Sequence, residues 1–353
     1  MRNQEETNYE VIIVGAGPSG LAAALTLLEE GISDVIVIER FEFPRYKCCA
    51  GYITEKTKAV YETFGLNIEE AHYSLIRDFN IFYRLKKRQT ILNKFLYTNR
   101  TIDRVELDNT FAELAKSKGI QIKENTTISE HDADKKELKL SNGEILTYEK
   151  LIFADGTSGF GSRLQAVHKK NIAMQLVFPN SAAEEIQIHF GITKRGYGWV
   201  SSYGGFTNVG LTDVFDKSVN YHEVFAGFLK KLGLQADMSA LRGAFTPMEV
   251  GEGKACEDIY FVGDAVGACD PMTLSGLRYG LDSGKLCAEA IAKKDDRLYF
   301  ACIRKMKKKF ALMRTLQKIF YLKACQVCVF DIGCRCFHRA IAYVFNHFFV
   351  NKK

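Results

Sequence analysis

The chain has 353 residues, of which 47% are hydrophobic and 25% are charged, and its formal net charge is +6. This length and composition suit two globular units, or one with an insertion, and exclude a disordered chain, a collagen and a small disulfide scaffold. The charge is divided unevenly. Residues 300–353 hold 12 Lys and Arg but one acid, Asp331, so this tail carries +11 and the rest of the chain −5. A basic tail on a mildly acidic body indicates an anionic partner, either lipid or nucleic acid.

Ten cysteines occur without an apolar leader, because residues 1–8 are polar. We therefore expect reduced thiols in a cytoplasmic protein and no disulfide framework. The best apolar stretch, around residues 340–350, is shorter than the roughly 18 residues that indicate a spanning helix. A transmembrane segment is therefore not expected.

The first predicted strand, residues 9–14, is an apolar run rich in β-branched side chains, as in the interior of a parallel sheet. It is followed by the turn GAGPSG at residues 15–20, by a predicted helix at 21–30 and by a strand at 35–38 that ends at Glu39. A G-x-G-x-x-G motif between a strand and a helix, with an acid at the next strand end, is the fingerprint of a dinucleotide site.

Each glycine of this fingerprint has its own task. Gly15 permits the tight turn, Gly17 lets the backbone approach a pyrophosphate, and Gly20 lets the helix pack closely on the strand. The pyrophosphate would lie on the amides of the helix N-terminus. The carboxylate of Glu39 would accept hydrogen bonds from ribose hydroxyls and would repel a 2′-phosphate, which disfavours NADP here. NAD and FAD sites share the fingerprint, so other segments must decide between them.

Three later segments are typical of flavin sites: residues 102–108 before a helix at 109–118, residues 151–163 with Asp155-Gly156 after an apolar strand, and residues 259–284 with Gly263-Asp264, Pro271 and a helix that begins near Gly276. A carboxylate at a strand end can bind a ribityl hydroxyl. A helix N-terminus can stabilise negative charge on a reduced flavin ring.

Between these segments, residues 77–98 and 165–250 are predicted as strands of a second sheet, with a helix at about 221–231. Such alternation suits an antiparallel sheet that covers the flavin face. Tyr197 and Trp199 occupy alternate positions of one strand and so face the same side, either a substrate pocket or a plain core. His189 alternates in another strand, and a hydrogen-bonded sheet histidine is expected rather than a substrate ligand.

The tail from Leu298 is predicted to be helical. Four lysines between residues 305 and 309 lie beside apolar and aromatic residues, which suits an interfacial helix on anionic lipid. The alternative is a helical cap on the body with a solvated lysine face. No nucleic-acid motif accompanies the charge, so we expect no nucleic acid partner. The cysteines at 325, 328, 334 and 336 are spaced more closely than in a usual zinc site, and free thiols without a metal are expected.

The order of these motifs resembles the FAD-dependent monooxygenase and reductase fold typified by para-hydroxybenzoate hydroxylase, and within it the geranylgeranyl reductase family. RYKCCAG at 45–51 is similar to the family's R-x-K-P-C-G-G loop, and GYGWV at 196–200 with NVGL at 208–211 to its G-Y-x-W-x-F-P and N-V-G-L strands. DPMTLSGL at 270–277 is similar to N-P-x-T-G-x-G-I. The length and basic tail resemble the short bacterial members linked to colicin M resistance. The resemblance covers about residues 8–330.

The chain departs from the family pattern at several positions. Cys48 stands in place of a proline, Ala50 and Leu274 in place of glycines, and Ser201-Ser202 in place of Phe-Pro. These changes bear on the substrate more than on the cofactor, because the FAD fingerprint is intact.

The resemblance implies an FAD-dependent oxidoreductase in which a hydride from the reduced flavin N5 reaches one carbon of an isoprenoid or related lipid double bond, and a proton reaches the other. One dinucleotide fingerprint is present, so the electron donor would be transient NAD(P)H or a ferredoxin-type protein. Two alternatives stay open: a monooxygenase of the same fold, and a non-catalytic flavin-bearing membrane or partner-binding protein. A halogenase is disfavoured because its W-x-W-x-I-P signature needs a second tryptophan beside Trp199.

The expected catalytic or substrate-pocket residues are Cys49, Tyr197 and Trp199. The expected FAD-binding residues come from the fingerprint and the resemblance together: Gly15, Gly17, Pro18, Ser19, Gly20, Glu39, Arg40, Arg45, Cys49, Ala50, Gly51, Arg104, Asp155, Gly156, Gly263, Asp264, Pro271, Gly276 and Leu277.

The expected fold class is α/β, a Rossmann-like FAD-binding domain with an inserted antiparallel-sheet substrate domain and a C-terminal helical segment. The FAD-binding domain is expected in three pieces, at 1–72, 101–164 and 251–296. The substrate domain is expected at 73–100 and 165–250, and the basic aromatic helices at 297–353. We expect the protein in the cytoplasm, at the inner membrane face if its tail binds lipid.

Overall fold

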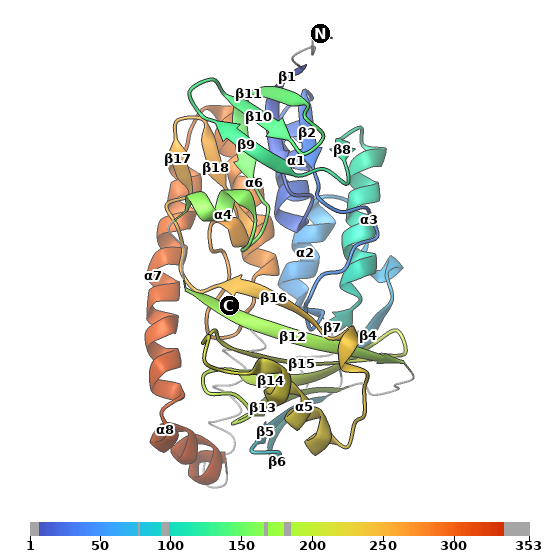
Figure 1. The fold of residues 1–353 in the computed structure, drawn as a ribbon, viewed down its shortest axis with the longest axis vertical. Coiled ribbons are helices and arrows are strands. Elements are labelled where there is room, and N and C mark those ends of the chain that lie inside the picture. Colours follow the sequence, from blue (N-terminus) through green and yellow to red (C-terminus); the bar gives the residue numbers. More distant parts are fainter. Residues whose placement is uncertain (1–6, 77, 93–98, 166–168, 180–184, 335–353) are drawn as a thin grey trace.

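The computed structural model describes residues 7–76, 78–92, 99–165, 169–179 and 185–334, and its two large sheets are built differently (Figure 1). The strands of the first sheet are β1 (Thr7–Val14), β2 (Val35–Ile38), β8 (Gln121–Lys123), β9 (Ile128–Asp132), β10 (Glu137–Leu140), β11 (Ile145–Phe153), β17 (Lys254–Cys256) and β18 (Ile259–Phe261). Its centre is parallel, with β1 between β2 and β11 and with β18 beside β11. Because both faces of these central strands are covered, each contains a continuous run of buried apolar residues, at 11–14, 35–38, 151–153 and 259–261.

Helices cover this sheet. The glycine-rich turn leads into α1 (Pro18–Glu29), which packs against α6 (Leu277–Lys293). The other helices are α2 (Glu55–Thr63), α3 (Arg104–Ser117), α4 (Phe160–Leu164), α5 (Tyr221–Leu232), α7 (Arg297–Phe320) and α8 (Lys323–Val327). Short 3-10 turns lie at Ile68–Glu70, Met238–Ala240 and Gly263–Ala265, and a π-helical turn lies at Cys328–Gly333.

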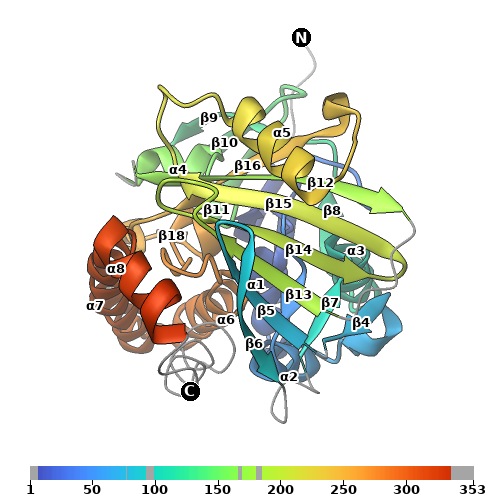
Figure 2. The ribbon, with the colours of Figure 1, turned by 90° about the horizontal axis from the view of Figure 1, so that it is seen from below.

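The second sheet is antiparallel except where β13 pairs in parallel with β5. Its strands, in spatial order, are β16 (Arg242–Pro247), β12 (Lys170–Pro179), β15 (Phe206–Val214), β14 (Tyr197–Tyr203), β13 (Glu185–Phe190), β5 (Asp78–Tyr83) and β6 (Lys86–Leu92). Helix α5 covers one face, where Phe225 and Phe228 pack with Val209 and Leu211 (Figure 2). The opposite face packs against residues near Cys48 and against the C-terminal segment.

A small three-stranded sheet lies between the two large ones. Its strands are β3 (Tyr52–Ile53), β7 (Arg100–Ile102) and β4 (Tyr73–Leu75), with β7 in the middle. Strands β7 and β4 contact β14 of the second sheet. The chain therefore crosses between the two large sheets several times.

The expected fold class is confirmed: a Rossmann-like parallel sheet, an antiparallel sheet and C-terminal helices. The strand predicted at 35–38 coincides with β2, and the helix predicted at 221–231 is α5 within one residue. Two helix starts were wrong. The helix predicted from residue 21 begins at Pro18. The helix predicted from Asn109 begins at Arg104, because the carboxylate of Asp103 accepts a hydrogen bond from the amide of Val105 at 2.9 Å and caps it.

The described part of the tail packs on the body as a helical cap. One face of α7 is buried along its length, by Tyr299, Ile303, Met306, Phe310 and Met313. Beyond α8, the ring of Phe330 stacks on Tyr83 with centroids 4.8 Å apart. Residues after 334, including Cys336 and the last aromatic residues, lie outside the described part. Within the described ranges, no helix combines the length and apolar character needed to cross a membrane, and no three His, Cys, Asp or Glu residues group as metal ligands.

His189 lies in the core of the second sheet, 1% exposed. Its ring stacks on Phe82, with centroids 4.4 Å apart, and meets Phe228 edge-on at 5.3 Å. Its Nε2 is 3.0 Å from the side-chain oxygen of Gln187. His189 is therefore a buried sheet histidine, as expected, but only one ring nitrogen is satisfied, because its Nδ1 has no hydrogen-bond partner among the described residues. Burial lowers the pKa of His189 from 6.5 to about 4.

This lowered pKa predicts an acid-sensitive stability. Below pH 6.5 the unfolded chain binds a proton at His189 that the folded chain does not bind until about pH 4, so stability falls as the pH drops through that range. The loss from pH 6.5 to 5 amounts to about 2 kcal/mol. In His189→Leu we expect urea unfolding to show a pH dependence shallower by about that amount. Parallel wild-type and variant profiles would contradict the assignment.

Candidate active site

A cavity of about 1560 Å³ lies between the two sheets. It extends from the carboxyl ends of β1, β2 and β11 to the inner face of β12, β13 and β14. Single ligand sites commonly occupy about 300–1,000 Å³, so the cavity has room for two ligands side by side. The expected site residues that line it are Gly15, Gly17, Pro18, Ser19, Glu39, Arg40, Arg45, Cys49, Ala50, Arg104, Asp155, Gly156, Tyr197, Trp199, Asp264, Gly276 and Leu277.

The turn before α1 is shaped for a phosphate. Gly15 has φ +105°, and a Cβ there would lie 2.5 Å from the carbonyl oxygen of Ala154. At Gly20 a Cβ would lie 2.0 Å from the Gly15 oxygen. At Gly17 the nearest atom to a Cβ is Nη2 of the Arg45 side chain, at an ordinary contact distance of 3.6 Å. The fold itself thus requires Gly15 and Gly20, whereas Gly17 leaves open space before the α1 amides. No side chain caps those amides, so they can bind an anion.

The end of β2 holds a fixed carboxylate. Glu39 is buried, its Oε2 accepts a hydrogen bond from the amide of Ala16 at 2.9 Å, and its Oε1 accepts one from Phe41 at 3.1 Å. Sequence reasoning missed the apolar residues that line this end of the cavity, Phe41, Ile128 and Phe160. They come from three separate segments of the chain, so no local sequence motif predicts them.

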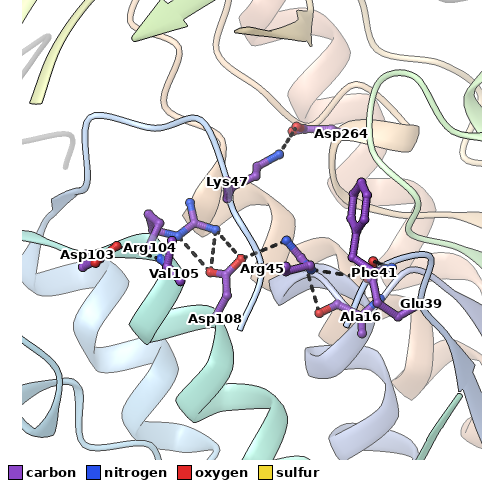
Figure 3. A network of polar contacts seen from close by, with 10 residues as sticks. All are labelled: Ala16, Glu39, Phe41, Arg45, Lys47, Asp103, Arg104, Val105, Asp108 and Asp264. Atoms are coloured by element: carbon purple, nitrogen blue, oxygen red, sulfur yellow. Dashed lines mark hydrogen bonds and ion pairs between the residues drawn. The ribbon is translucent and has the colours of Figure 1, made fainter. Parts of the chain in front are cut away.

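Two arginines meet one buried acid behind the turn (Figure 3). Arg104 donates to both carboxylate oxygens of Asp108, at 2.7–3.0 Å, and Arg45 Nη1 lies 3.6 Å from the same group. Arg45 also lies 3.5 Å from Glu39 and donates to the carbonyl of Ala16 at 3.3 Å. The cluster holds two positive side chains in place beside the anion site. Asp108 was missed, although its i, i+4 spacing from Arg104 was a usable signal.

Asp155, at the end of β11, offers a free acceptor to the cavity. Its Oδ2 accepts the amide of Gly161 at 2.7 Å, while its buried Oδ1 has no hydrogen-bond partner among the described residues. Burial raises the pKa of this carboxyl to about 6. A buried polar atom without a partner is costly, and a ligand hydroxyl would satisfy it. The residues present therefore fit a flavin dinucleotide: open amides, two arginines and two placed carboxylates.

Four of the expected cofactor residues shape the backbone without lining the cavity: Gly20, Gly51, Gly263 and Pro271. Gly51 has φ +75°, and a Cβ there would lie 2.2 Å from the carbonyl oxygen of Ile102. The carbonyl of Pro271 accepts a hydrogen bond from the buried Gln317 of α7 at 2.8 Å. These residues allow close packing of the backbone. A sequence motif does not distinguish a residue with that role from one that contacts the ligand.

The loop at 45–51 is fastened to the second sheet beside the cavity. The amide of Cys49 donates to the side chain of Gln175 at 2.9 Å, and the side chain of Asn208 donates to the Cys49 carbonyl at 2.9 Å. Asn208 in turn accepts the indole N–H of Trp199 at 3.0 Å. Burial raises the pKa of the neighbouring Cys48 thiol to about 12, so this thiol stays protonated. Gln175 was missed, because it lies in a strand far from the loop in sequence.

The loop at 270–276 closes the other side. Tyr197 donates its hydroxyl hydrogen to the carbonyl of Thr273 at 2.8 Å. The carboxylate of Asp270 accepts the amides of Met272 and Thr273 at 3.0 and 3.2 Å. Leu274, at the family's glycine position, has φ +55° in the left-handed region and lines the cavity. The flanking hydrogen bonds hold this strained residue in place.

Comparison with known proteins agrees with this geometry. Residues 8–159 match the FAD binding domain family. A menaquinone reductase of Mycolicibacterium smegmatis is 26% identical over 315 residues, which are 80% of this chain and 76% of that protein. A digeranylgeranylglycerophospholipid reductase of Methanocaldococcus jannaschii is 24% identical over 314 residues, covering 81% and 77%. A solved geranylgeranyl bacteriochlorophyll reductase-like protein of Thermoplasma acidophilum has the same fold, with TM-score 0.77, 17% identity and coverage of 97% and 96%.

The open helix N-terminus, the fixed acids and the matched domain define an FAD-dependent oxidoreductase. More particularly, the chain is similar to a menaquinone reductase and to a digeranylgeranylglycerophospholipid reductase.

The two glycines with different surroundings give a matched test of the FAD site. Gly17→Val puts bulk in front of the α1 amides without meeting fixed atoms, so we expect loss of FAD but a change of less than about 0.5 kcal/mol in the stability of the FAD-free protein. Gly20→Ala drives a Cβ into the Gly15 carbonyl and should cost about 3 kcal/mol. Flavin absorbance and thermal unfolding measure both. A Gly17→Val protein that stays yellow would refute the site.

Proposed function

We propose that this flavoprotein reduces carbon–carbon double bonds of an isoprenoid or a related lipid. The observation that carries the proposal is that one cavity joins the residues suited to FAD with an apolar compartment on the second sheet. The compartment is lined by side chains that suit a hydrocarbon chain: Phe79, Ile172, Ala173, Ile186, Ile188 and Trp199. The two relatives compared above are reductases whose names refer to isoprenoid compounds.

The chain itself would bind, orient and protonate the substrate. FAD, when bound, supplies a hydride from N5 of its reduced ring. The apolar compartment excludes water from the double bond. Cys49 lines the cavity on a loop held by Gln175 and Asn208, and we assign its thiol the role of proton donor. Tyr197 keeps its proton because burial raises its pKa, and it fixes the loop beside it.

The other finer assignments belong to the same proposal. The electron donor is transient NAD(P)H or a ferredoxin-type protein, because the sequence has one dinucleotide fingerprint. We assign FAD binding to residues 1–72, 101–164 and 251–296, and substrate binding to 73–100 and 165–250. The likeness to the short members linked to colicin M resistance rests on chain length and the basic tail, and it stays a prediction.

The tail supports a position at a membrane surface. Five large apolar side chains in it are 50–61% exposed: Leu298, Leu312, Ile319, Leu322 and Ile332. The exposed lysines Lys308, Lys318 and Lys323 lie among them. Exposed apolar and basic side chains on neighbouring helical segments suit binding to anionic lipid. We therefore assign the protein to the cytoplasmic face of the membrane.

The reductase proposal predicts turnover without oxygen. After anaerobic photoreduction, the holoprotein should convert polyprenyl lipids to products heavier by two mass units per reduced double bond, as measured by mass spectrometry. Cys49→Ala should retain FAD and slow this conversion about 10²-fold or more. Cys48→Ala, at the neighbouring thiol that points to Gln175, is the matched control and should stay within about tenfold.

Two outcomes would count against the reductase. Oxygen-dependent consumption of NAD(P)H with incorporation of oxygen into product would identify the monooxygenase of the same fold. A flavin that no donor reduces and no acceptor reoxidises would identify a binding protein without turnover.

The tail predicts lipid binding that depends on charge and apolar contact. Vesicles containing phosphatidylglycerol should sediment with the protein, and pure phosphatidylcholine vesicles should do so weakly. Replacing Ile319 and Leu322 by serine should weaken binding about tenfold or more. Leu75→Ser, at an exposed apolar residue of β4, is the control and should bind as the wild type does. Equal loss in both variants would contradict a tail-specific surface.

A further inference from the structure

The four lysines between residues 305 and 309 lie on different faces of α7. Four residues of α7 line the cavity at helical spacing: Cys302, Lys305, Met306 and Lys309. Lys307 forms an ion pair with Glu252 at 2.5 Å, and Lys308 is exposed to solvent outside the cavity lining. Two of the four lysines thus point to the cavity, and the others do not. The run of lysines suggests one charged surface in the sequence. In the fold, its members lie on two different surfaces.

Helix α6 adds one more cation and one acid to this edge of the cavity. Arg278 and Asp282 line it and form an ion pair with each other at 3.4 Å. Lys309 donates to the hydroxyl of Tyr279 at 2.7 Å and lies over its ring. Tyr279 carries no charge, so this contact positions the lysine without neutralising it.

Two positive charges are therefore left over at the edge. Within the described ranges, neither Lys305 nor Lys309 forms an ion pair with a carboxylate. Three acids that line the cavity are already engaged: Asp282 with Arg278, Asp264 with Lys47 at 3.7 Å and Glu55 with Arg100 at 3.2 Å. The arginines of the FAD site, Arg45 and Arg104, are separate, because they are held by Asp108 behind the α1 turn.

We propose that Lys305 and Lys309, assisted by Arg278, bind a phosphate group on the lipid whose isoprenoid chain occupies the apolar compartment. This inference rests on the proposed reductase function and names the head group of its substrate. Charged nitrogen donors suit phosphate oxygens, and such hydrogen bonds are stronger than neutral ones. A cavity that is apolar at one end and cationic at its solvent edge matches a molecule with a hydrocarbon tail and an anionic head.

This charge distinguishes between the two kinds of relative described above. A quinone ring carries no charge and gains nothing from two unpaired ammonium groups at the cavity edge. A phosphorylated lipid does gain from them. The phosphate can come from a glycerophospholipid or from a prenyl diphosphate, which share this chemistry.

The test is a binding titration of the FAD-loaded protein in neutral detergent, followed by the change in flavin absorbance. The ligands are digeranylgeranylglyceryl phosphate, geranylgeranyl diphosphate, digeranylgeranylglycerol without phosphate, menaquinone and NADPH. The double variant Lys305→Gln with Lys309→Gln should bind the two phosphorylated lipids at least about tenfold more weakly. Its affinity for the phosphate-free lipid and for menaquinone should change less than about threefold.

The matched control is Lys230→Gln with Lys231→Gln, which removes the same charge at two exposed lysines of α5 outside the cavity lining. It should bind every ligand as the wild type does. The larger loss among the two phosphorylated lipids identifies the source of the phosphate. FAD content and thermal unfolding should be unchanged in both double variants, because these lysines are at the surface or solvent edge.

Three outcomes overturn the inference: unchanged affinity for both phosphorylated lipids, an equal loss for the phosphate-free lipid, or a loss confined to NADPH. The last would assign the site to the electron donor. Reduction of charged and neutral lipids at equal rates by wild type and variants would refute the phosphate site and leave the reductase standing. Phosphate-dependent binding without any gain in lipid mass would support the phosphate site and refute the reductase.

Discussion

The attachment of the loop at 45–51 to both halves of the molecule is the constraint on which the site depends. On one side, Arg45 contacts Glu39 and Asp108 of the dinucleotide half. On the other, the backbone of Cys49 is bonded through its amide to Gln175 and through its carbonyl to Asn208. A seven-residue segment therefore sets the distance between the glycine-rich turn and the second sheet. Because its backbone groups are satisfied by side chains of the second sheet, the loop stays ordered where it borders a large cavity.

Several residues along the same cavity have conformations or unpaired atoms that lower the local stability of the fold. Asp155 keeps one oxygen without a partner and has a raised pKa, which favours a ligand that donates a hydrogen bond. Leu274 adopts a left-handed backbone that costs a bulky residue about 1 kcal/mol or more. The surrounding bonds at Asp270, Thr273 and Pro271 keep that conformation in place. Such locally unfavourable features are expected at a binding site that is formed before its ligand binds.

The C-terminal helices support the candidate active site and also present an exposed surface. Gln317 of α7 holds the carbonyl of Pro271, and Phe330 beyond α8 packs on Tyr83 of the second sheet. Within residues 297–334, the basic side chains have three kinds of surroundings: ion pairs with the body, such as Lys307 with Glu252, the cavity edge at Lys305 and Lys309, and solvent. The net charge of +6 is therefore the sum of groups with different surroundings.

The sequence by itself determined the parallel core, the dinucleotide fingerprint and the shared orientation of Tyr197 and Trp199. These features depend on strand period, helix period and glycine geometry, which act over a few neighbouring residues. Only the tertiary structure decided that Gln175 and Asn208 hold Cys49, because they lie 126 and 159 residues away from it in the chain. It also decided which lysines of α7 face the cavity. A helix repeats its faces along its own axis, but the face that meets a cavity is chosen by the packing of α7 against α6.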